Sequence, residues 1–375
     1  MSPSPIRDFA ARFLLPRSLI AFLVASVICG PLARALDQPL FPAVNADGAG
    51  YIDAEGKVVI AIKFGSARPF SEDLAPVELG GNWGYLKPDG GFAIIPQFDD
   101  AGPFSGGLAP VQRGEVWSYV DASGKIVIPG PFESAEPFVR ELALVETGGA
   151  WGLIDRTGKA VSANYAAIGP FSEELAAVSE DGKWGFVNAS GAIAIQPQFA
   201  GVGPFREGVA RALNADKWGF IDKTGAWVLE PKYDRVGDFF DSLAAFKSGK
   251  KWGWIDRTFR EVIAAKFAQV RPFSEDIAAV QLDRVWGYVD PNGRFIMEPQ
   301  FKDAQEFREG LAIVATSRGY GFIDPKGRAV VRARYLAVKA FDGPLAEVTF
   351  GDWSAPQFGY VNRAGQQVWP PAKGR

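Results

Sequence analysis

Short apolar runs, separated by glycine-containing turns, return along the chain at a nearly constant interval. In one copy, residues 74–77 are followed by a Gly-Gly turn, by residues 83–86, by a second turn and by residues 92–95. Runs of about four residues joined by tight turns predict β-strands paired in hairpins. Each copy is therefore predicted to be an antiparallel meander of three strands, and we expect minimal helix.

The most regular mark of the repeat is an aromatic residue followed by glycine. Successive copies lie 33 or 34 residues apart, and the last interval is 38. The copies are Trp83-Gly84, Trp151-Gly152, Trp184-Gly185, Trp218-Gly219, Trp252-Gly253 and Trp286-Gly287, with the variants Trp117-Ser118, Tyr320-Gly321 and Phe358-Gly359. Ala49-Gly50 is a degenerate first copy. Ten units are predicted, at residues 39–64, 74–98, 108–132, 142–165, 175–199, 209–233, 243–267, 277–301, 311–335 and 345–370.

A turn and a loop keep fixed positions relative to each aromatic-glycine pair. The turn has Asp or Asn first and Gly fourth, as in Asp121 to Gly124 and Asn188 to Gly191, which is type I turn chemistry. The loop reads Pro-Phe-Ser-Glu, or a variant of it, before a Leu-Ala-x-Val strand. Its copies begin at Pro69, Pro103, Pro170, Pro204 and Pro272.

These motifs carry a resemblance to a known family. Lys-Trp-Gly triplets begin at Lys183, Lys217 and Lys251, with Asp-x-x-Gly downstream and Pro-Phe-Ser-Glu-x-Leu-Ala beyond. In this respect the chain resembles the bacterial WG-repeat family over about residues 40–370. The resemblance implies a β-rich repeat protein, and it brings no common activity or ligand with it.

The central strand of each unit is apolar on both faces. Trp184 and Phe186 share one face and Val187 takes the other, because alternate residues of a strand face opposite sides. Each sheet is therefore predicted to be sandwiched between its neighbours, with Gly185 letting the next sheet approach and the loop Phe pinning the connection into the core. The predicted core tryptophans are Trp83, Trp117, Trp151, Trp184, Trp218, Trp252 and Trp286.

The predicted fold is all-β, with about ten three-stranded sheets in series. We expect an open solenoid or superhelix, because ten sheets exceed the usual four to eight blades of a β-propeller. The ends also support this choice, since the chain opens and closes on whole units and no split unit can join them. A closed or nearly closed propeller is the alternative.

The first 35 residues have the order of a secretory signal. Arg7, Arg12 and Arg17 precede an apolar run of about ten residues, and Ala33-Arg34-Ala35 fits signal peptidase. The run is short for a membrane span. We expect export to the periplasm or the medium, cleavage near Leu36 and no stable membrane span afterwards, with an uncleaved anchor as the alternative.

The amino-acid composition excludes several kinds of catalytic and metal-binding site. The chain has no histidine, and its one cysteine, Cys29, lies in the predicted leader. This excludes a Ser-His-Asp triad, a cysteine nucleophile and a thiolate or imidazole zinc site in the mature chain. Residues 36–375 carry a net charge of −6. A dispersed acidic balance argues against a nucleic-acid binder, which needs a clustered basic surface.

Two acidic patterns suggest chemistry that the repeat argues against. Glu72, Glu173 and Glu275 are each followed by a second acid, as in a carboxylate pair for glycoside hydrolysis. They recur in equivalent loops, however, whereas a catalytic centre is a single asymmetric cluster. Calcium needs six to eight oxygen ligands, and one Asp per turn is insufficient. We therefore predict no catalytic residue, metal or cofactor.

Departures from the repeat are the candidate partner-binding residues. They are Trp353, in a lengthened hairpin, Trp227, outside the Trp-Gly position, and Arg332 and Arg334, in a basic stretch that also holds Arg328 and Lys339. The predicted function is an exported interaction scaffold for a protein or glycan partner. The alternatives are a carboxylate-dependent carbohydrate-active enzyme and a purely structural envelope component.

Overall fold

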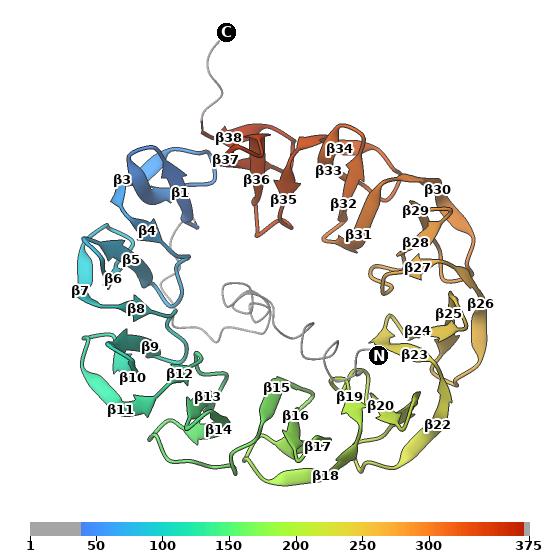
Figure 1. Cartoon of the computed structure of the whole chain (residues 1–375). Coiled ribbons are helices and arrows are strands. Elements are labelled where there is room, and N and C mark those ends of the chain that lie inside the picture. The colour runs from blue at the N-terminus through green and yellow to red at the C-terminus, as the bar shows by residue number, and fades with distance from the viewer. Residues whose placement is uncertain (1–38, 371–375) are drawn as a thin grey trace, which may run out of the picture. The chain divides into compact units, whose positions relative to one another are not determined.

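The computed structural model describes residues 39–370, so the predicted leader lies outside the described residues. Within this range the chain forms ten small antiparallel sheets in chain order around a ring (Figure 1). The first sheet meets the tenth. The prediction of an all-β repeat array is confirmed. The described part is a ten-bladed β-propeller, so the expected open solenoid is wrong.

The strands are as follows. The first three sheets contain β1 (Phe41–Asn45), β2 (Gly48–Ile52) and β3 (Val58–Phe64); β4 (Ser66–Ala67), β5 (Ala75–Leu79), β6 (Asn82–Leu86) and β7 (Phe92–Phe98); and β8 (Asp100–Ala101), β9 (Leu108–Arg113), β10 (Val116–Asp121) and β11 (Ile126–Phe132). The fourth, fifth and sixth contain β12 (Ser134–Ala135), β13 (Leu142–Thr147) and β14 (Ala150–Asp155); β15 (Ala167–Ser172), β16 (Leu175–Glu180), β17 (Lys183–Asn188) and β18 (Ile193–Phe199); and β19 (Gly201–Val202), β20 (Ala210–Asn214), β21 (Lys217–Ile221) and β22 (Trp227–Tyr233).

The seventh and eighth sheets contain β23 (Arg235–Phe240), β24 (Leu243–Ser248), β25 (Lys251–Asp256) and β26 (Glu261–Phe267); and β27 (Gln269–Val270), β28 (Ala278–Leu282), β29 (Val285–Val289) and β30 (Phe295–Phe301). The ninth and tenth contain β31 (Asp303–Arg308), β32 (Leu311–Thr316), β33 (Gly319–Ile323) and β34 (Ala329–Tyr335); and β35 (Ala337–Val338), β36 (Leu345–Asp352), β37 (Ala355–Asn362) and β38 (Gln367–Trp369).

Most sheets have one strand more than the predicted three. The additional strand comes from the segment just before the Pro-Phe-Ser-Glu loop, as β4 does, and pairs with the next strand on the inner side of the ring (Figure 1). It is often only two residues long, which is why the strand pattern does not reveal it. The first sheet has no such strand among the described residues, and the fourth lacks a regular outer strand.

The glycine after each tryptophan makes room within its own sheet. A Cβ on Gly185 would lie 2.4 Å from the carbonyl oxygen of Ile195 and 2.6 Å from the nitrogen of Pro197, both in β18. The register between β17 and β18 shifts at this point, as in a β-bulge. The expectation that Gly185 admits the next sheet is therefore wrong, because the close approach comes from the bulged outer strand.

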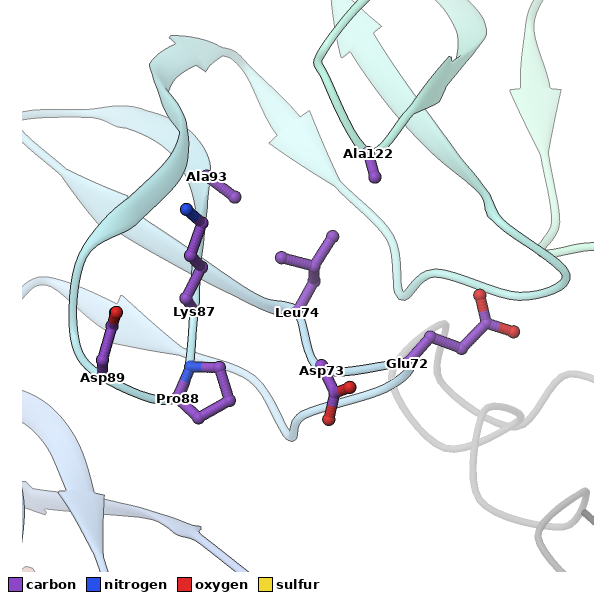
Figure 2. A pocket seen from close by; sticks show the side chains of 8 residues that line it. All are labelled: Glu72, Asp73, Leu74, Lys87, Pro88, Asp89, Ala93 and Ala122. Atoms are coloured by element: carbon purple, nitrogen blue, oxygen red, sulfur yellow. The ribbon is translucent and has the colours of Figure 1, made fainter. Parts of the chain in front are cut away.

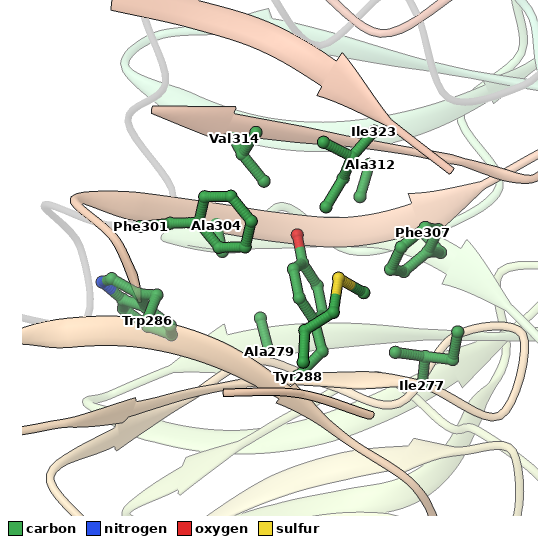
Figure 3. Packing of buried hydrophobic residues seen from close by; sticks show 11 residues of the cluster. Ile277, Ala279, Trp286, Tyr288, Phe301, Ala304, Phe307, Ala312, Val314 and Ile323 are labelled. Carbon is green, nitrogen blue, oxygen red and sulfur yellow. The ribbon is translucent and has the colours of Figure 1, made fainter. Parts of the chain in front are cut away.

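The core lies between neighbouring sheets. Figure 3 shows the cluster between the eighth and ninth, where Tyr288 and Phe307 pack with ring centroids 5.0 Å apart. Phe307 stands at the loop-Phe position, and Tyr288 lies two residues after Trp286. The Tyr288 hydroxyl donates a 2.9 Å hydrogen bond to the Gln305 carbonyl. The loop Phe thus pins each connection into the core, as predicted.

The Ser and Glu of the same loop reach forward to the next repeat. Ser71 donates a 2.7 Å hydrogen bond to the Phe104 carbonyl, one repeat later. The Glu72 carboxylate accepts bonds of 2.6 and 2.7 Å from the amides of Gly106 and Gly107. Equivalent serine bonds join Ser105 to Phe138, Ser172 to Phe205 and Ser274 to Phe307. The motif therefore couples adjacent sheets.

The ring closes through side chains of the tenth sheet. The Tyr360 hydroxyl donates a 2.8 Å hydrogen bond to the Pro42 carbonyl, and the Trp369 indole donates one of 3.2 Å to the Val44 carbonyl. Phe41 contacts the Tyr360 ring at 6.0 Å between centroids. The buried residues at this junction are Phe41, Ala43, Ile52, Leu345 and Trp369. The first and tenth units therefore contact each other directly, without a unit that is split between the two ends of the chain.

Among the described residues, these closing bonds stand where most other sheets have an inner strand. In the second sheet, the carbonyls of Pro76 and Glu78 accept bonds from the backbone amides that flank β4. Pro42 and Val44 are the equivalent residues of β1, one repeat earlier. Their carbonyls accept the tenth sheet's side-chain donors instead. Within residues 39–370, the ring therefore closes without a split sheet, through side chains that bond two carbonyls of β1.

Candidate functional site

The tenth sheet carries the longest hairpin of the ring. β36 and β37 have eight residues each, whereas the corresponding strands elsewhere have five or six. Their pairing continues to Asp352 opposite Ala355 at the tip. All eight residues from Gly351 to Phe358 are exposed. This segment, residues 351–358, is called the exposed hairpin below.

Two aromatic side chains stand on the exposed hairpin. Trp353 is 73% exposed and Phe358 is 53% exposed. The tip is ordered by Asp352, whose carboxylate accepts hydrogen bonds from the amides of Ser354 and Ala355 at 2.9 and 3.1 Å. The hydrogen bond from the Ser354 hydroxyl also lowers the pKa of Asp352 below its usual value. The hydrogen-bonded turn therefore holds the Trp353 indole in an exposed position.

Phe358 was missed at the level of sequence. It stands at the tryptophan position of the repeat, where the other residues are half-buried or buried, and the sequence pattern identified it only as a variant of the aromatic-glycine pair. The sequence signal that could have indicated the exposure of Phe358 lies after it in the chain. The other repeats have Phe or Tyr 14 or 15 residues later, whereas Lys373 lies 15 residues after Phe358.

The other candidate partner residues do not gather around Trp353. Arg332 and Arg334 lie exposed on β34, and both line a small pocket that Ala364 and Gly365 complete. The Arg334 guanidinium stacks on the Tyr335 ring, 5.1 Å from its centroid. Among the described residues, no hydrogen bond, ion pair or ring contact joins either arginine to the exposed hairpin.

Trp227 and the two remaining basic residues have partners. Trp227 is half-buried and meets Phe199 edge to face, 5.5 Å between centroids, so it packs the fifth sheet against the sixth. Arg328 pairs with Asp324 at 2.6 Å, and Lys339 pairs with Glu347 at 2.8 Å.

The predicted core tryptophans lie at the margin of the core. Trp286 is 5% exposed, while Trp83, Trp117, Trp151, Trp184, Trp218 and Trp252 are half-buried. Several have an arginine over the ring, as Arg68 has over Trp83 at 4.1 Å and Arg211 over Trp218 at 5.3 Å. The fully buried residue is the aromatic two positions later, such as Tyr85 or Trp254.

The loop carboxylates are engaged by backbone amides. Glu173 accepts bonds from the Gly208 amide at 3.1 and 3.0 Å, and Glu275 accepts from Gly310 at 3.2 and 3.0 Å. Burial alone would raise the pKa of Glu173, but hydrogen bonds from Lys223 and Gly208 outweigh it and lower the pKa. These acids hold successive turns together, which is a structural use of their charge.

A hollow that Glu72 helps to line lies between the second and third sheets (Figure 2). Its lining residues are Glu72, Asp73, Leu74, Lys87, Pro88, Asp89, Ala93 and Ala122. The Glu72 carboxylate already accepts the two glycine amides described above, so it is not a free reactive group. Among residues 39–370, no cluster of three or more His, Cys, Asp or Glu is placed to hold a metal ion.

The aspartates of the Asp-x-x-Gly turns also accept hydrogen bonds from residues of their own turns. One carboxylate oxygen of Asp121 accepts bonds from the Ser123 hydroxyl at 2.6 Å and from the Ser123 amide at 2.9 Å. Asp155 and Asp222 do the same with Thr157 and Thr224. The Asp of the Asp-x-x-Gly motif thus stabilises its own turn.

The ring of ten four- or three-stranded antiparallel sheets makes this protein a β-propeller. The family model for the WG containing repeat matches residues 50–83, 83–117, 117–149, 151–184, 184–218, 218–252, 252–284, 286–316 and 320–352. The chain therefore belongs to the family of WG-containing repeat proteins, which confirms the resemblance. A comparison with curated proteins gave no match.

Several solved structures are similar to this chain at low sequence identity. A crystal structure of the eukaryotic initiation factor has a TM-score of 0.50 and 9% identity, covering 89% of this chain and 95% of that chain. The extracellular domain of a putative hybrid two-component system from B. thetaiotaomicron has a TM-score of 0.32 and 9% identity, covering 85% and 61%. Hsv2p of Kluyveromyces lactis has a TM-score of 0.32 and 10% identity, covering 60% and 91%. The likeness to the initiation factor concerns the fold alone.

No helix in the described range is long and apolar enough to cross a membrane.

Proposed function

We propose that this protein is a non-catalytic interaction scaffold, in which the propeller holds the exposed hairpin as a docking element for a protein or glycan partner. The observation that carries the proposal is Trp353, 73% exposed at the tip of an ordered turn. Trp is among the residues that contribute most to binding when a partner buries it. Phe358 extends the apolar surface along the same hairpin.

The proposal includes export, for which the predicted leader is the support. An exported scaffold would meet its partner in the periplasm or outside the cell. The carbohydrate-active alternative is less favoured, because the carboxylates that suggested it accept hydrogen bonds from the next turn's amides. A purely structural role is the remaining alternative, and it requires no partner that depends on Trp353.

A quantitative capture experiment tests the proposal. The immobilised chain is incubated with a native envelope extract, and bound proteins and glycans are compared with those bound by Trp353→Ala and by a separate Arg332→Ala, Arg334→Ala variant. We expect Trp353→Ala to lose a specific partner, and the arginine variant tests separately whether the pocket on β34 contributes to capture. Ile95→Ala is the matched control for Trp353→Ala, because Ile95 is an apolar residue 67% exposed in another sheet. Equal capture by Trp353→Ala and the parent chain would contradict docking at the exposed hairpin.

A further inference from the structure

In four sheets, a basic residue directly follows the Asp or Asn of the Asp-x-x-Gly turn. These residues are Arg156, Lys223, Arg257 and Arg363. Three of them bond the Pro-Phe-Ser-Glu loop of the preceding sheet. The Lys223 ammonium pairs with the Glu173 carboxylate at 3.0 Å, the Arg363 guanidinium pairs with Glu309, and the Arg156 guanidinium donates to the Gly106 carbonyl. A cationic side chain at this position therefore links each of these turns to the loop before it.

The third sheet has Ala122 at this position, beside the loop that contains Glu72. Glu72 has the place of Glu173 in its loop, and both carboxylates accept hydrogen bonds from the next turn's amides. The methyl group of Ala122 is too short to reach that loop. Figure 2 shows Ala122 facing Leu74 and Glu72 across the hollow, which has a volume of about 490 Å³. The hollow therefore lies where other sheets place a basic side chain.

The other sheets without a basic residue at this position differ from the third. The eighth and ninth have Pro291 and Pro325 there. The fifth has Ala189, but the corresponding loop has Arg140 in place of the glutamate, and Arg140 pairs with the Glu174 carboxylate. In the first sheet Ala54 corresponds to a loop with glycine. Among the described residues, Ala122 alone combines a small side chain with a loop glutamate.

The lining of the hollow suits a positively charged side chain. Three acids and one lysine line it, and Figure 2 places the Lys87 side chain beside Ala93, away from the Glu72 carboxylate. A carboxylate offers about four lone-pair sites, so two glycine amides leave Glu72 with acceptor capacity. Glu173 uses this capacity, because it binds the Gly208 amide and Lys223 together. Leu74 and Ala93 form an apolar wall for the methylene groups of a long side chain.

We propose that this hollow receives an arginine side chain from a protein partner. The guanidinium would bond the carbonyl and the carboxylate of Glu72, as the Arg363 guanidinium bonds both groups of Glu309. Arginine is favoured over lysine because its planar fork of donors can bond two acceptors at once. The hollow belongs to the second and third sheets, so the inference goes beyond docking through Trp353 and does not depend on it.

The probe is the blocked tripeptide acetyl-Gly-Arg-Gly-amide, which carries one arginine and no terminal charge. Its binding to the full chain is followed by the NMR shifts of backbone amides. We expect saturable shifts confined to residues 72–74, 106–107 and 121–124. The same peptide with citrulline keeps the shape and lacks the charge, so it should bind about tenfold more weakly. Equal binding of the two peptides, or no saturable binding to the intact chain, would overturn the proposal.

Variants of the turn position test the site from the protein side. Ala122→Arg should fill the hollow with the chain's own side chain and abolish peptide binding. It should fold, because Arg156 has the same turn position, and a thermal melt checks this. Ala189→Arg is the matched control, since it makes the same change beside Arg140, and it should bind like the parent chain. Undiminished binding to Ala122→Arg would overturn the proposal.

A gain of binding is expected where a basic residue is removed. Lys223→Ala should open an equivalent hollow beside Glu173, so that two peptides bind to each chain. The additional shifts should appear in residues 173–175 and 207–208. A single site in Lys223→Ala would show that the space beside the loop glutamate does not select a cation, and the proposal would be wrong.

Two further arms separate the competing occupants. Free arginine that bound about tenfold more tightly than the tripeptide would assign the hollow to the amino acid and overturn the partner. A dimer of the unliganded chain that dissociates in Ala122→Arg, measured by light scattering, would assign it to a second copy and overturn it equally. If the peptide failed to bind while Trp353-dependent capture persisted, this inference alone would be wrong. If the peptide bound and no partner depended on Trp353, this inference would stand and docking at the exposed hairpin would be wrong.

Discussion

The indole nitrogen of Trp369 and the carbonyl oxygen of Val44 lie 3.2 Å apart, although the two residues are separated by 325 positions in the chain. Trp369 pairs with Tyr360 in the position that Ile94 has opposite Tyr85. The larger side chain at this position reaches β1 and closes the ring.

Replacement of Trp369 by alanine should therefore loosen the junction of the first and tenth sheets. We expect faster hydrogen exchange in residues 41–52 and 345–369, because a buried aromatic residue and a closing hydrogen bond are both lost. Ile94→Ala is the control, since it removes the equivalent residue at a junction that a covalent connection still spans. Unchanged protection of β1 and β2 in Trp369→Ala would show that other contacts close the ring.

Within a middle repeat, the buried aromatic should matter more than the tryptophan. Phe220 is 1% exposed, whereas Trp218 is half-buried beneath Arg211. We expect Phe220→Ala to cost about 3–5 kcal/mol of unfolding free energy, and Trp218→Ala to cost less. Denaturant unfolding measures both, and hydrogen exchange should place the damage mainly in residues 209–233, since repeats contact mainly their neighbours. A larger loss for Trp218→Ala would reverse this ranking.

Stability should fall at both extremes of pH. Hydrogen bonds from the turn hydroxyls lower the pKa of Asp121, Asp155 and Asp222 below the usual 3.8. Their contribution is present above pH 3.8 and is lost as the pH falls through the lowered values. Burial raises the pKa of Tyr85 and Tyr288 above 10, so their contribution is complete below pH 10 and is lost as the pH rises further.

Thermal melts across the pH range test this prediction. A chain with Thr157 and Thr224 changed to valine lacks two of the hydroxyl donors and should show a smaller loss of stability in acid than the parent chain. Identical acid profiles would mean that these turn bonds do not set the acid limit.

We expect the loop glutamates to have a structural role and not a catalytic one. Changing Glu72, Glu173 and Glu275 together to Gln keeps one oxygen acceptor on each side chain, replaces the other oxygen with an NH2 donor and removes the charge, so one of the two amide hydrogen bonds of Glu72 is lost. We expect a folded chain with slightly lower thermal stability and unchanged Trp353-dependent partner capture. Abolished function in a chain that melts normally would instead favour the carboxylate-dependent enzyme.

Much of the fold could be predicted from local pattern. The strand runs and the Asp-x-x-Gly turns depend on residues that are close in sequence. The burial of side chains such as the loop Phe is revealed by the pattern of apolar positions. Asp121 bonding to Ser123 is such a local effect. The inner strands were missed because two residues such as Ser66 and Ala67 have no periodicity.

What the sequence by itself determined was the repeat: its length, its all-β character, its family and the loop Phe that packs into its core. The tertiary structure decided how the repeats curve and what they leave exposed. Closure of the ring requires Trp369 of the tenth sheet to reach Val44 of the first. Whether it does depends on the nine rotations from each sheet to the next, added around the ring, and no local sequence pattern determines that total. Exposure of Phe358 likewise depends on which neighbour covers it, so the same repeat position is core in one sheet and surface in the last.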